Sequence, residues 1–324
     1  MARRIHRKNP DMTTFRHDLA LSPDAPPSRQ ARIFNTIIRN SGRRLWAASA
    51  STDAGLIRFR KINSALRTRA PKGVRISPHE FPAFSAEWVR AGEVDESKVV
   101  LYLHGGGYFF GGPTMYRGLS WRLSAAAKRP VLVLDYRLAP EHTPSDALED
   151  ALTAYDALIA MGHAPQDVTV GGDSAGGHLA LSLLHALKRR GSELPGTVVA
   201  ISPWVDLLCT ADSHTANAAS DHVIPAVKLK WLGERFCEAA ASGDPLFDPV
   251  HGDYTGFPPL LLISSTTEIL RDDAHTVASR AKEAGVEVVH REWTGQAHVF
   301  PVFADYIPEG KAAIADIGEF LRSR

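Results

Sequence analysis

The chain has 324 residues, of which 44% are hydrophobic and 23% are charged, and its formal net charge is +1. This composition is that of an ordinary globular protein, and the length allows one large α/β domain with an accessory element. No stretch approaches the roughly 18 consecutive apolar residues of a membrane helix, which argues against stable membrane insertion.

The N-terminus and the cysteines are informative about the cellular location of the protein. The first 21 residues, "MARRIHRKNPDMTTFRHDLAL", have the basic start of a signal peptide without its apolar core. The two cysteines, Cys209 and Cys237, have no metal-ligand spacing, and we interpret them as buried or idle thiols. These features predict a cytoplasmic protein.

Positive charge is concentrated near the N-terminus. Residues 1–80 contain 17 Lys/Arg and 5 Asp/Glu, which leaves a net charge of −11 for the rest of the chain. Such an arm can bind nucleic acid or an anionic membrane surface. Here basic and apolar residues alternate, as in "LIRFRKINSALR", and no nucleic-acid motif is present. The pattern favours amphipathic helices packed on an acidic body and predicts no nucleic-acid partner.

Eight strand-like runs follow this region. The first two alternate in polarity, and several later ones are continuous Val/Leu/Ile runs, as expected of parallel strands covered on both faces. The runs begin near residues 73, 84, 98, 130, 167, 196, 259 and 286. Helical patterns separate the later runs, the clearest having Thr143 as N-cap, Pro144 at its first position and Gly162 at its end. This order predicts a doubly wound α/β sheet.

Two segments do not fit the alternation of strands and helices. Residues 1–70 precede the sheet and have a helical pattern. Residues 206–258 separate two strands by more than one crossover helix needs. We predict that 71–324 forms the main domain, and that 1–70 and 206–258 together build a helical cap beside the carboxyl edge of the sheet.

A glycine-flanked serine follows the fifth run. Gly172-Asp173-Ser174-Ala175-Gly176 matches G-x-S-x-G and stands between a strand-like run and a helical one. In that context the motif predicts a nucleophile elbow, with Ser174 lifted to the end of the sheet, rather than a chance Gly-rich turn.

A second glycine motif, "LYLHGGGYFFGG", directly follows the third run. Successive glycines let backbone N–H groups turn inward, so the N–H groups of Gly105, Gly106 and Ala175 are the predicted oxyanion hole. A phosphate-binding loop is the alternative, but G-K-[ST] and the G-x-G-x-x-G spacing are both missing. Tyr108, Phe109 and Phe110 of this motif either wall an apolar substrate pocket or pack in the core. Trp204, in "SPWVDL", is a further candidate for the pocket.

One histidine of the 14 is placed to act as a base. His298, in "WTGQAHVFP", lies in a loop just after the last strand-like run. His104 and His178 sit within the other motifs and are better explained by loop structure and helix packing, and His275 is expected to face out of a helix.

These motifs resemble a known family. "HGGGYFFGG", "DYRLAPEH", "GGDSAGG", "SPWVDL", "EILRDD" and "GQAHVF" have the order and rough spacing of the hormone-sensitive-lipase-like α/β-hydrolases, over about residues 75–320. The resemblance implies an eight-stranded, mostly parallel sheet, a helical cap and no metal or organic cofactor. It also implies a triad with Ser174 as nucleophile and His298 as base. Within "DYRLAPEH", Arg137 and Glu141 are expected to brace loops.

Three carboxylates compete to be the acid of this triad. The family usually writes D-P-L-R-D-E here with its first acid catalytic, and Glu268 stands at that place. Independently of the family, Glu268 falls in the loop after a strand, where sites of open α/β sheets assemble. Asp272 and Asp273 would begin the next helix, where N-capping and the helix dipole already explain them. The acid is therefore predicted to be Glu268, with Asp272 as the alternative.

The predicted function is a carboxylesterase acting on small to medium apolar esters through an acyl-enzyme. An amide deacetylase could use the same residues. A small-molecule receptor on this scaffold, similar to the plant gibberellin receptors that lack the catalytic histidine, fits less well because Ser174 and His298 are both present. The family often pairs through its last strand, which here predicts a homodimer.

Overall fold

The computed structural model describes residues 21–63, 68–236, 244 and 246–324. All eight predicted strands are present in one sheet with the order β1-β2-β4-β3-β5-β6-β7-β8. β1 and β2 are antiparallel to their neighbours, and all other neighbours are parallel. The strands are β1 (Arg75–Glu80), β2 (Ser85–Arg90), β3 (Val99–Leu103), β4 (Val131–Asp135), β5 (Val168–Asp173), β6 (Thr197–Ile201), β7 (Leu260–Ser265) and β8 (Val288–Trp293).

The central strands are apolar throughout because both faces of the sheet are covered. Successive side chains of a strand point to opposite faces. Leu101 accordingly packs in one core cluster and its neighbour Tyr102 in the other. Helices α4 (Pro113–Ala127) and α10 (Pro308–Arg322) cover the second face. The first face is covered by α5 (Pro144–Ala160), α6 (Ala175–Arg190) and α9 (Arg271–Glu283).

The predicted start of α5 is confirmed in detail. The Thr143 hydroxyl accepts a hydrogen bond from the N–H of Asp146, and the Asp146 carboxylate accepts one from the N–H of Thr143. This reciprocal pair satisfies two donors that a helix N-terminus leaves without a helical partner. Pro144 occupies the first turn, and Gly162 follows the C-cap with a φ of 98°.

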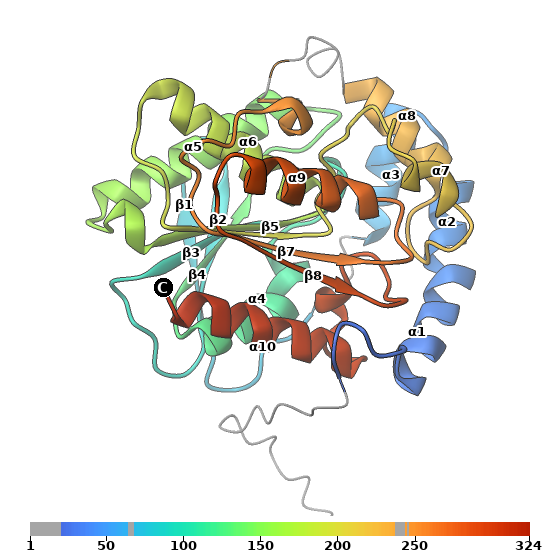
Figure 1. Ribbon diagram of the computed structural model, residues 1–324, viewed down its shortest axis with the longest axis horizontal. Helices are drawn as coiled ribbons and strands as arrows, with labels where there is room; N and C mark the ends of the chain where they lie inside the picture. The colour runs from blue at the N-terminus through green and yellow to red at the C-terminus, as the bar shows by residue number, and fades with distance from the viewer. Residues whose placement is uncertain (1–20, 64–67, 237–243, 245) are drawn as a thin grey trace, which may run out of the picture.

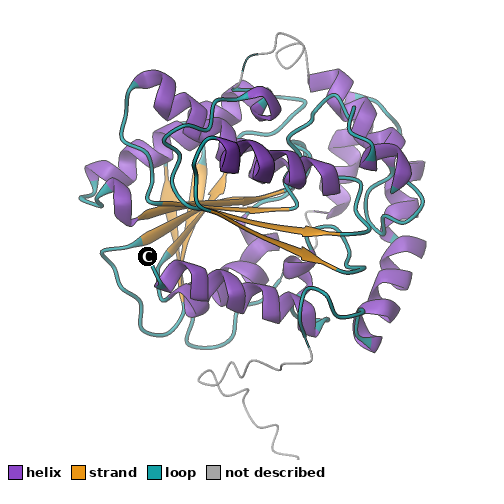
Figure 2. Cartoon of the chain, viewed as in Figure 1, coloured by secondary structure: helices purple, strands orange, loops and turns teal. Residues whose placement is uncertain are grey.

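The remaining helices gather at the end of the sheet to which β7 and β8 point (Figure 2). They come from both segments that interrupt the α/β alternation, and polar contacts connect the two segments. Arg43 donates to the carbonyl of Ala218 at 2.9 Å, and Arg235 forms an ion pair with Asp53 at 3.0 Å. These helices are α1 (Arg29–Asn40), α2 (Gly42–Ala48), α3 (Asp53–Asn63), α7 (Ser213–Ala216) and α8 (Ala226–Phe236).

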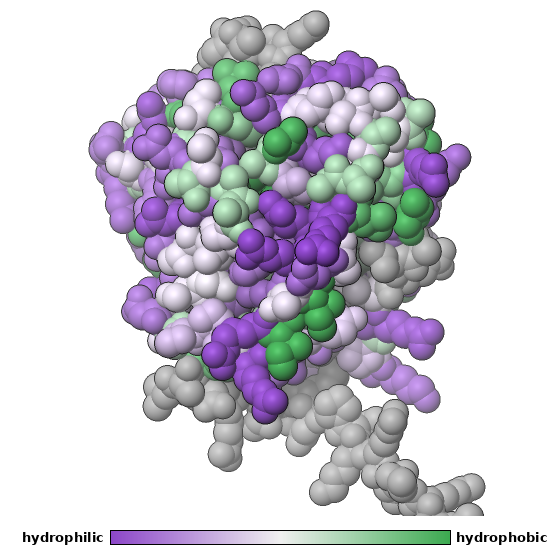
Figure 3. Space-filling model, turned by 90° about the vertical axis from the view of Figure 1, so that its right-hand side faces the viewer, coloured by the Kyte–Doolittle hydropathy of each residue, from purple (hydrophilic) through white to green (hydrophobic). Residues whose placement is uncertain are grey.

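The outer surface at this end mixes apolar and hydrophilic side chains (Figure 3). Ile33 and Ile37 on α1 and Leu45 on α2 are each more than half exposed. No helix within the described ranges is long and apolar enough to cross a membrane. Short 3₁₀ turns also occur among the described residues: η1 (Pro165–Asp167), η3 (Pro249–His251) and η4 (Phe300–Phe303).

Candidate active site

Ser174 stands in a strained turn between β5 and α6. Its backbone has φ 53° and ψ −121°, a conformation that residues other than glycine rarely adopt and that is typical of a nucleophile elbow. A Cβ atom at Gly172 would overlap the carbonyl of Gly176, and one at Gly176 would overlap the carbonyl of Leu103. The two glycines are therefore required for the turn to pass this close to β3.

The serine hydroxyl, the histidine and Glu268 form one chain of hydrogen bonds. Ser174 Oγ lies 3.0 Å from His298 Nε2, and His298 Nδ1 lies 2.8 Å from Glu268 Oε2. The three residues come from loops after β5, β8 and β7, which end at the same edge of the sheet. All are at most 7% exposed. In this arrangement His298 can accept the serine proton at one nitrogen while the other donates to a carboxylate.

Glu268 is held by groups around it. Its other oxygen, Oε1, accepts hydrogen bonds from the N–H of Ser265 at 2.7 Å and the hydroxyl of Ser202 at 3.1 Å. The alternative acid, Asp272, is directed elsewhere and accepts from the N–H of Ser213. Of the carboxylates that the sequence offered, Glu268 is the one in contact with His298.

Asp273 has a different role from the one predicted for the start of a helix. It is buried, and its carboxylate binds His214 Nε2 at 2.8 Å and the N–H groups of Val205 and Asp206. Asp273 does stand in the first turn of α9, as predicted, but N-capping and the helix dipole do not account for these contacts. The residue instead connects α9 to the loop after β6.

The surroundings of His298 raise the pKa of its imidazole. Burial by itself would lower the pKa of the imidazole, but the hydrogen bond and charge of Glu268 raise it above the ordinary value. Asp221 and Asp173 contribute in the same upward direction. The protonated imidazole is thus stabilised at the point where a proton from Ser174 would arrive.

The prediction that Gly105 lines an oxyanion hole is wrong. Its N–H already donates to the Tyr116 hydroxyl at 3.0 Å and to Asp173 Oδ1 at 3.1 Å. The Asp173 carboxylate is buried and also accepts from the hydroxyls of Tyr102 and Tyr116. Despite these donors, burial raises the pKa of Asp173 to about 6. Gly105 therefore fastens the glycine loop, residues 104–112, to the residue before Ser174.

The next two glycines have N–H groups that are free to bind a ligand. Neither Gly106 nor Gly107 donates a backbone hydrogen bond to any residue that the structure describes. Ala175 is the first residue of α6, where N–H groups have no helical partner. Sequence reasoning missed Gly107 because a run of three glycines does not reveal which peptides turn inward.

Three of the predicted pocket residues are buried in the structure. Tyr108, Phe109 and Trp204 are at most 2% exposed. Phe109 contacts Trp46 of α2 and Phe59 of α3, with ring centroids 6.3 and 5.7 Å apart. An aromatic cluster thus joins the glycine loop to the N-terminal helices.

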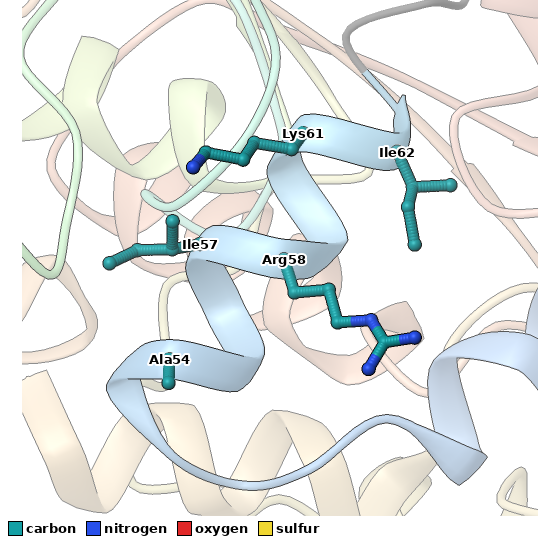
Figure 4. Close-up of a pocket in the computed structure, with 5 residues that line it drawn as sticks. All are labelled: Ala54, Ile57, Arg58, Lys61 and Ile62. Atoms are coloured by element: carbon teal, nitrogen blue, oxygen red, sulfur yellow. The ribbon is translucent and has the colours of Figure 1, made fainter.

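A groove of about 490 Å³ is lined by residues of α3 (Figure 4). Phe59, which faces the aromatic cluster, is on the inner side of this helix. The groove residues recur three and four positions apart and so form the outer face. They are Ala54, Ile57, Arg58, Lys61 and Ile62. The groove thus lies along a different face of α3 from the one that Phe59 occupies.

The other residues that the sequence singled out have structural contacts. Arg137 pairs with Asp150 at 2.8 Å, and Glu141 pairs with Arg60 of α3, so both brace loops as predicted. His275 is exposed and contacts Glu292. Cys209 is a free, partly buried thiol, whereas Cys237 lies outside the described residues. No group of three or more His, Cys, Asp or Glu in the described part of the chain could hold a metal ion.

Residues 100–302 match the model of a family described as having the alpha/beta hydrolase fold. The chain belongs to this α/β-hydrolase family. The matched range includes the glycine loop, Ser174, Glu268 and His298.

Curated and solved relatives agree with this α/β-hydrolase assignment. An acetyl-hydrolase of Streptomyces hygroscopicus is 42% identical over 239 residues, which cover 74% of this chain and 80% of the relative. The crystal structure of EstE5 soaked with p-nitrophenyl butyrate superposes on this chain with a TM-score of 0.85 at 33% identity. An esterase from the bacterial hormone-sensitive lipase family has a TM-score of 0.83 at 35% identity. In both cases the match covers 91% of this chain and 98% of the chain in the solved structure. The resemblance to hormone-sensitive-lipase-like hydrolases is thus confirmed.

Proposed function

We propose that this α/β-hydrolase is a carboxylesterase whose catalytic residues are Ser174, His298 and Glu268. The observation that carries the proposal is the unbroken hydrogen-bond chain from the Ser174 hydroxyl through His298 to the buried Glu268. The esterase and acetyl-hydrolase relatives support ester hydrolysis as the reaction.

The geometry supports a two-step reaction. Ser174 Oγ attacks the ester carbonyl carbon while His298 Nε2 takes its proton, and Glu268 stabilises the imidazolium. The N–H groups of Gly106, Gly107 and Ala175 would bind the negatively charged oxygen. Collapse of this intermediate breaks the bond to the alcohol, which leaves with the proton from His298. Water then attacks the acyl-enzyme with the same base, releasing the acid and restoring Ser174.

Small to medium apolar esters are the proposed substrates. The names of the relatives support short acyl groups, and the aromatic cluster around Phe109 supports an apolar environment near the glycine loop. We propose that α1–α3 and the 206–258 segment together form the cap over the site. An amide substrate would need the same residues, so anilides should be assayed beside esters. A cytoplasmic location, a homodimer and the lack of a nucleic-acid partner stay predictions from the sequence.

The direct test is Ser174→Ala with p-nitrophenyl acetate and butyrate as substrates. Wild-type protein should turn over both esters, and the variant should lose on the order of 10⁶-fold in kcat, as other serine hydrolases do without their nucleophile. Circular dichroism should show the same fold, because the change removes one oxygen. Undiminished turnover by Ser174→Ala would refute the serine-esterase proposal.

A further inference from the structure

The glycine loop has a second point of attachment, at the residue after Gly107. The Tyr108 hydroxyl lies 2.6 Å from Nδ1 of His178, which stands on α6 one turn beyond the nucleophile. Both side chains are at most 2% exposed, and their rings meet edge to face. This contact does not belong to the chain of hydrogen bonds that links Ser174, His298 and Glu268.

Hydrogen bonding assigns His178 one tautomer. Its Nε2 lies 3.2 Å from the carbonyl oxygen of Phe247, which can only accept, so Nε2 carries the proton. Nδ1 is then the acceptor for the Tyr108 hydroxyl. Burial lowers the pKa of His178 to about 4, which keeps the ring neutral and preserves this arrangement. The imidazole therefore bridges the glycine loop and the 206–258 segment.

The Tyr108–His178 hydrogen bond lies next in the chain to Gly106 and Gly107, whose N–H groups would bind an oxyanion. Tyr108 has a positive φ of 64°, and its carbonyl accepts from the N–H of Ala139 at 2.8 Å. With its hydroxyl and its carbonyl both bound, Tyr108 has little freedom to rotate. Gly107, which has no Cβ and a φ of 57°, has little stiffness of its own. Its orientation depends on the residues that flank it.

We propose that His178 is a positioning residue that holds the N–H groups of Gly106 and Gly107 in place through the Tyr108 hydroxyl. This inference rests on the proposed esterase function and adds His178 as a residue that acts through Tyr108. Through Phe247, the same imidazole ties the oxyanion-binding loop to the proposed cap.

Tyr108→Phe tests the inference with the least disturbance, because it removes one oxygen and keeps the ring. We expect kcat for p-nitrophenyl acetate to fall about tenfold, less than the 10²–10³-fold cost of deleting an oxyanion donor, with KM changed less than about twofold. Tyr254→Phe is the matched control. It removes another buried hydroxyl, which bonds Pro249 in the same segment away from the glycine loop, and should leave kcat unchanged.

A short alkylboronic acid separates positioning from general stability. Its boron takes the Ser174 oxygen and becomes a tetrahedral anion, so its affinity depends on the oxyanion-binding groups. Tyr108→Phe should weaken boronate binding by about the same factor as kcat. His178→Asn should weaken binding at least as much, because it also breaks the contact with Phe247. The double variant should be no worse than His178→Asn, since both changes break the Tyr108–His178 contact.

Two results are decisive. Wild-type turnover that Ser174→Ala abolishes establishes the serine-esterase mechanism, and without it the inference has no basis. With that result in hand, a Tyr108→Phe variant that matches Tyr254→Phe in both kcat and boronate affinity overturns the role of His178 alone.

Discussion

Glu268 reaches His298 because several groups fix a longer acid side chain in one position. One carboxylate oxygen is bound by the backbone N–H of Ser265 and by the hydroxyl of Ser202, which leaves the other for the imidazole. A carboxylate bound in this way cannot rotate away from His298 without breaking hydrogen bonds in a fully buried site. The environment thus makes the glutamate as well oriented as a shorter aspartate would be.

Glu268→Gln should therefore disable the enzyme. Glutamine keeps the shape but cannot stabilise the imidazolium, and it can present an N–H to His298 where an acceptor is needed. We expect kcat/KM for a short ester to fall by about 10⁴-fold, as in the equivalent triad change of a serine protease. Asp272→Asn is the matched control and should stay close to wild type. If Asp272→Asn instead lost most of its activity and Glu268→Gln stayed close to wild type, Asp272 would be the acid that supports His298.

The acidic limb of the pH profile should report His298. A base must be unprotonated to act, and kcat/KM reports the pKa of the free enzyme. Because Glu268 raises the pKa of His298 against the effect of burial, the wild-type limb should lie above the ordinary value of 6.5. In Glu268→Gln only burial and the weaker effects of Asp221 and Asp173 remain, so the limb should move to lower pH. A limb that stays in place would show that another group titrates.

Helix α9 shows how two neighbouring acids in one first turn can differ. Asp272 is partly exposed and accepts one backbone N–H, whereas Asp273 is buried against His214 and two peptides. Burial by itself lowers the pKa of His214, but Asp273 and Cys209 together more than offset this and raise it to about 10. The pair therefore joins α9 to the 206–258 segment as an ion pair at neutral pH.

Asp273→Asn should destabilise the fold much more than Asp272→Asn. Removing one partner of a buried ion pair costs on the order of 3 kcal/mol, whereas a first-turn acid contributes about 0.3–1 kcal/mol. Because the folded pKa of His214 is raised, its stabilising contribution is complete below pH 6.5 and is lost as the pH rises through 10. Urea unfolding at neutral pH measures the difference, and equal midpoint shifts for the two variants would contradict it.

Helix α3 presents its two faces to different surroundings. Phe59 contacts Phe109 and Phe110 of the glycine loop, whereas Ile62 is half exposed beside the outer groove. If the proposed cap encloses the acyl chain, only the inner face should affect chain-length preference.

Phe59→Ala should accordingly lower kcat/KM for an octanoate ester several-fold more than for acetate, since a longer chain relies on more apolar contacts. Ile62→Ala, on the same helix, should leave the ratio unchanged. A panel of p-nitrophenyl esters measures both. Deletion of residues 1–45 should have the same effect as Phe59→Ala. If neither change altered the chain-length preference, the N-terminal helices would not form a cap over the substrate.

At the scale of the whole molecule, the sequence predicts most of the sheet and only part of the site. Continuous Val/Leu/Ile runs identify several of the later strands, because a strand buried on both faces carries no competing pattern. Alternation in polarity identifies β1 and β2. Ser174, Glu268 and His298 can be placed because each follows a strand. Which N–H groups line the glycine loop and where Asp273 points could not be predicted, since both depend on contacts between segments 30 or more residues apart.

The two edges of the sheet differ in how readily they can accept another strand. β1 contains Pro78, which lacks an N–H and disfavours further pairing, whereas β8 contains no proline. An edge with unpaired backbone groups is suited to pair with a second copy across a two-fold axis. The homodimer predicted from the sequence therefore fits the β8 edge better than the β1 edge.

Light scattering at micromolar concentration should give the mass of a dimer. Arg291→Pro, at an exposed position of β8, should yield a monomer because proline removes a donor and bends the edge. Arg75→Pro, exposed on β1, is the matched control and should leave the dimer intact. A monomeric wild type would contradict the prediction at once. A dimer that survives Arg291→Pro with an unchanged dissociation constant would place the interface elsewhere, because pairing through β8 cannot tolerate a proline in the middle of the strand.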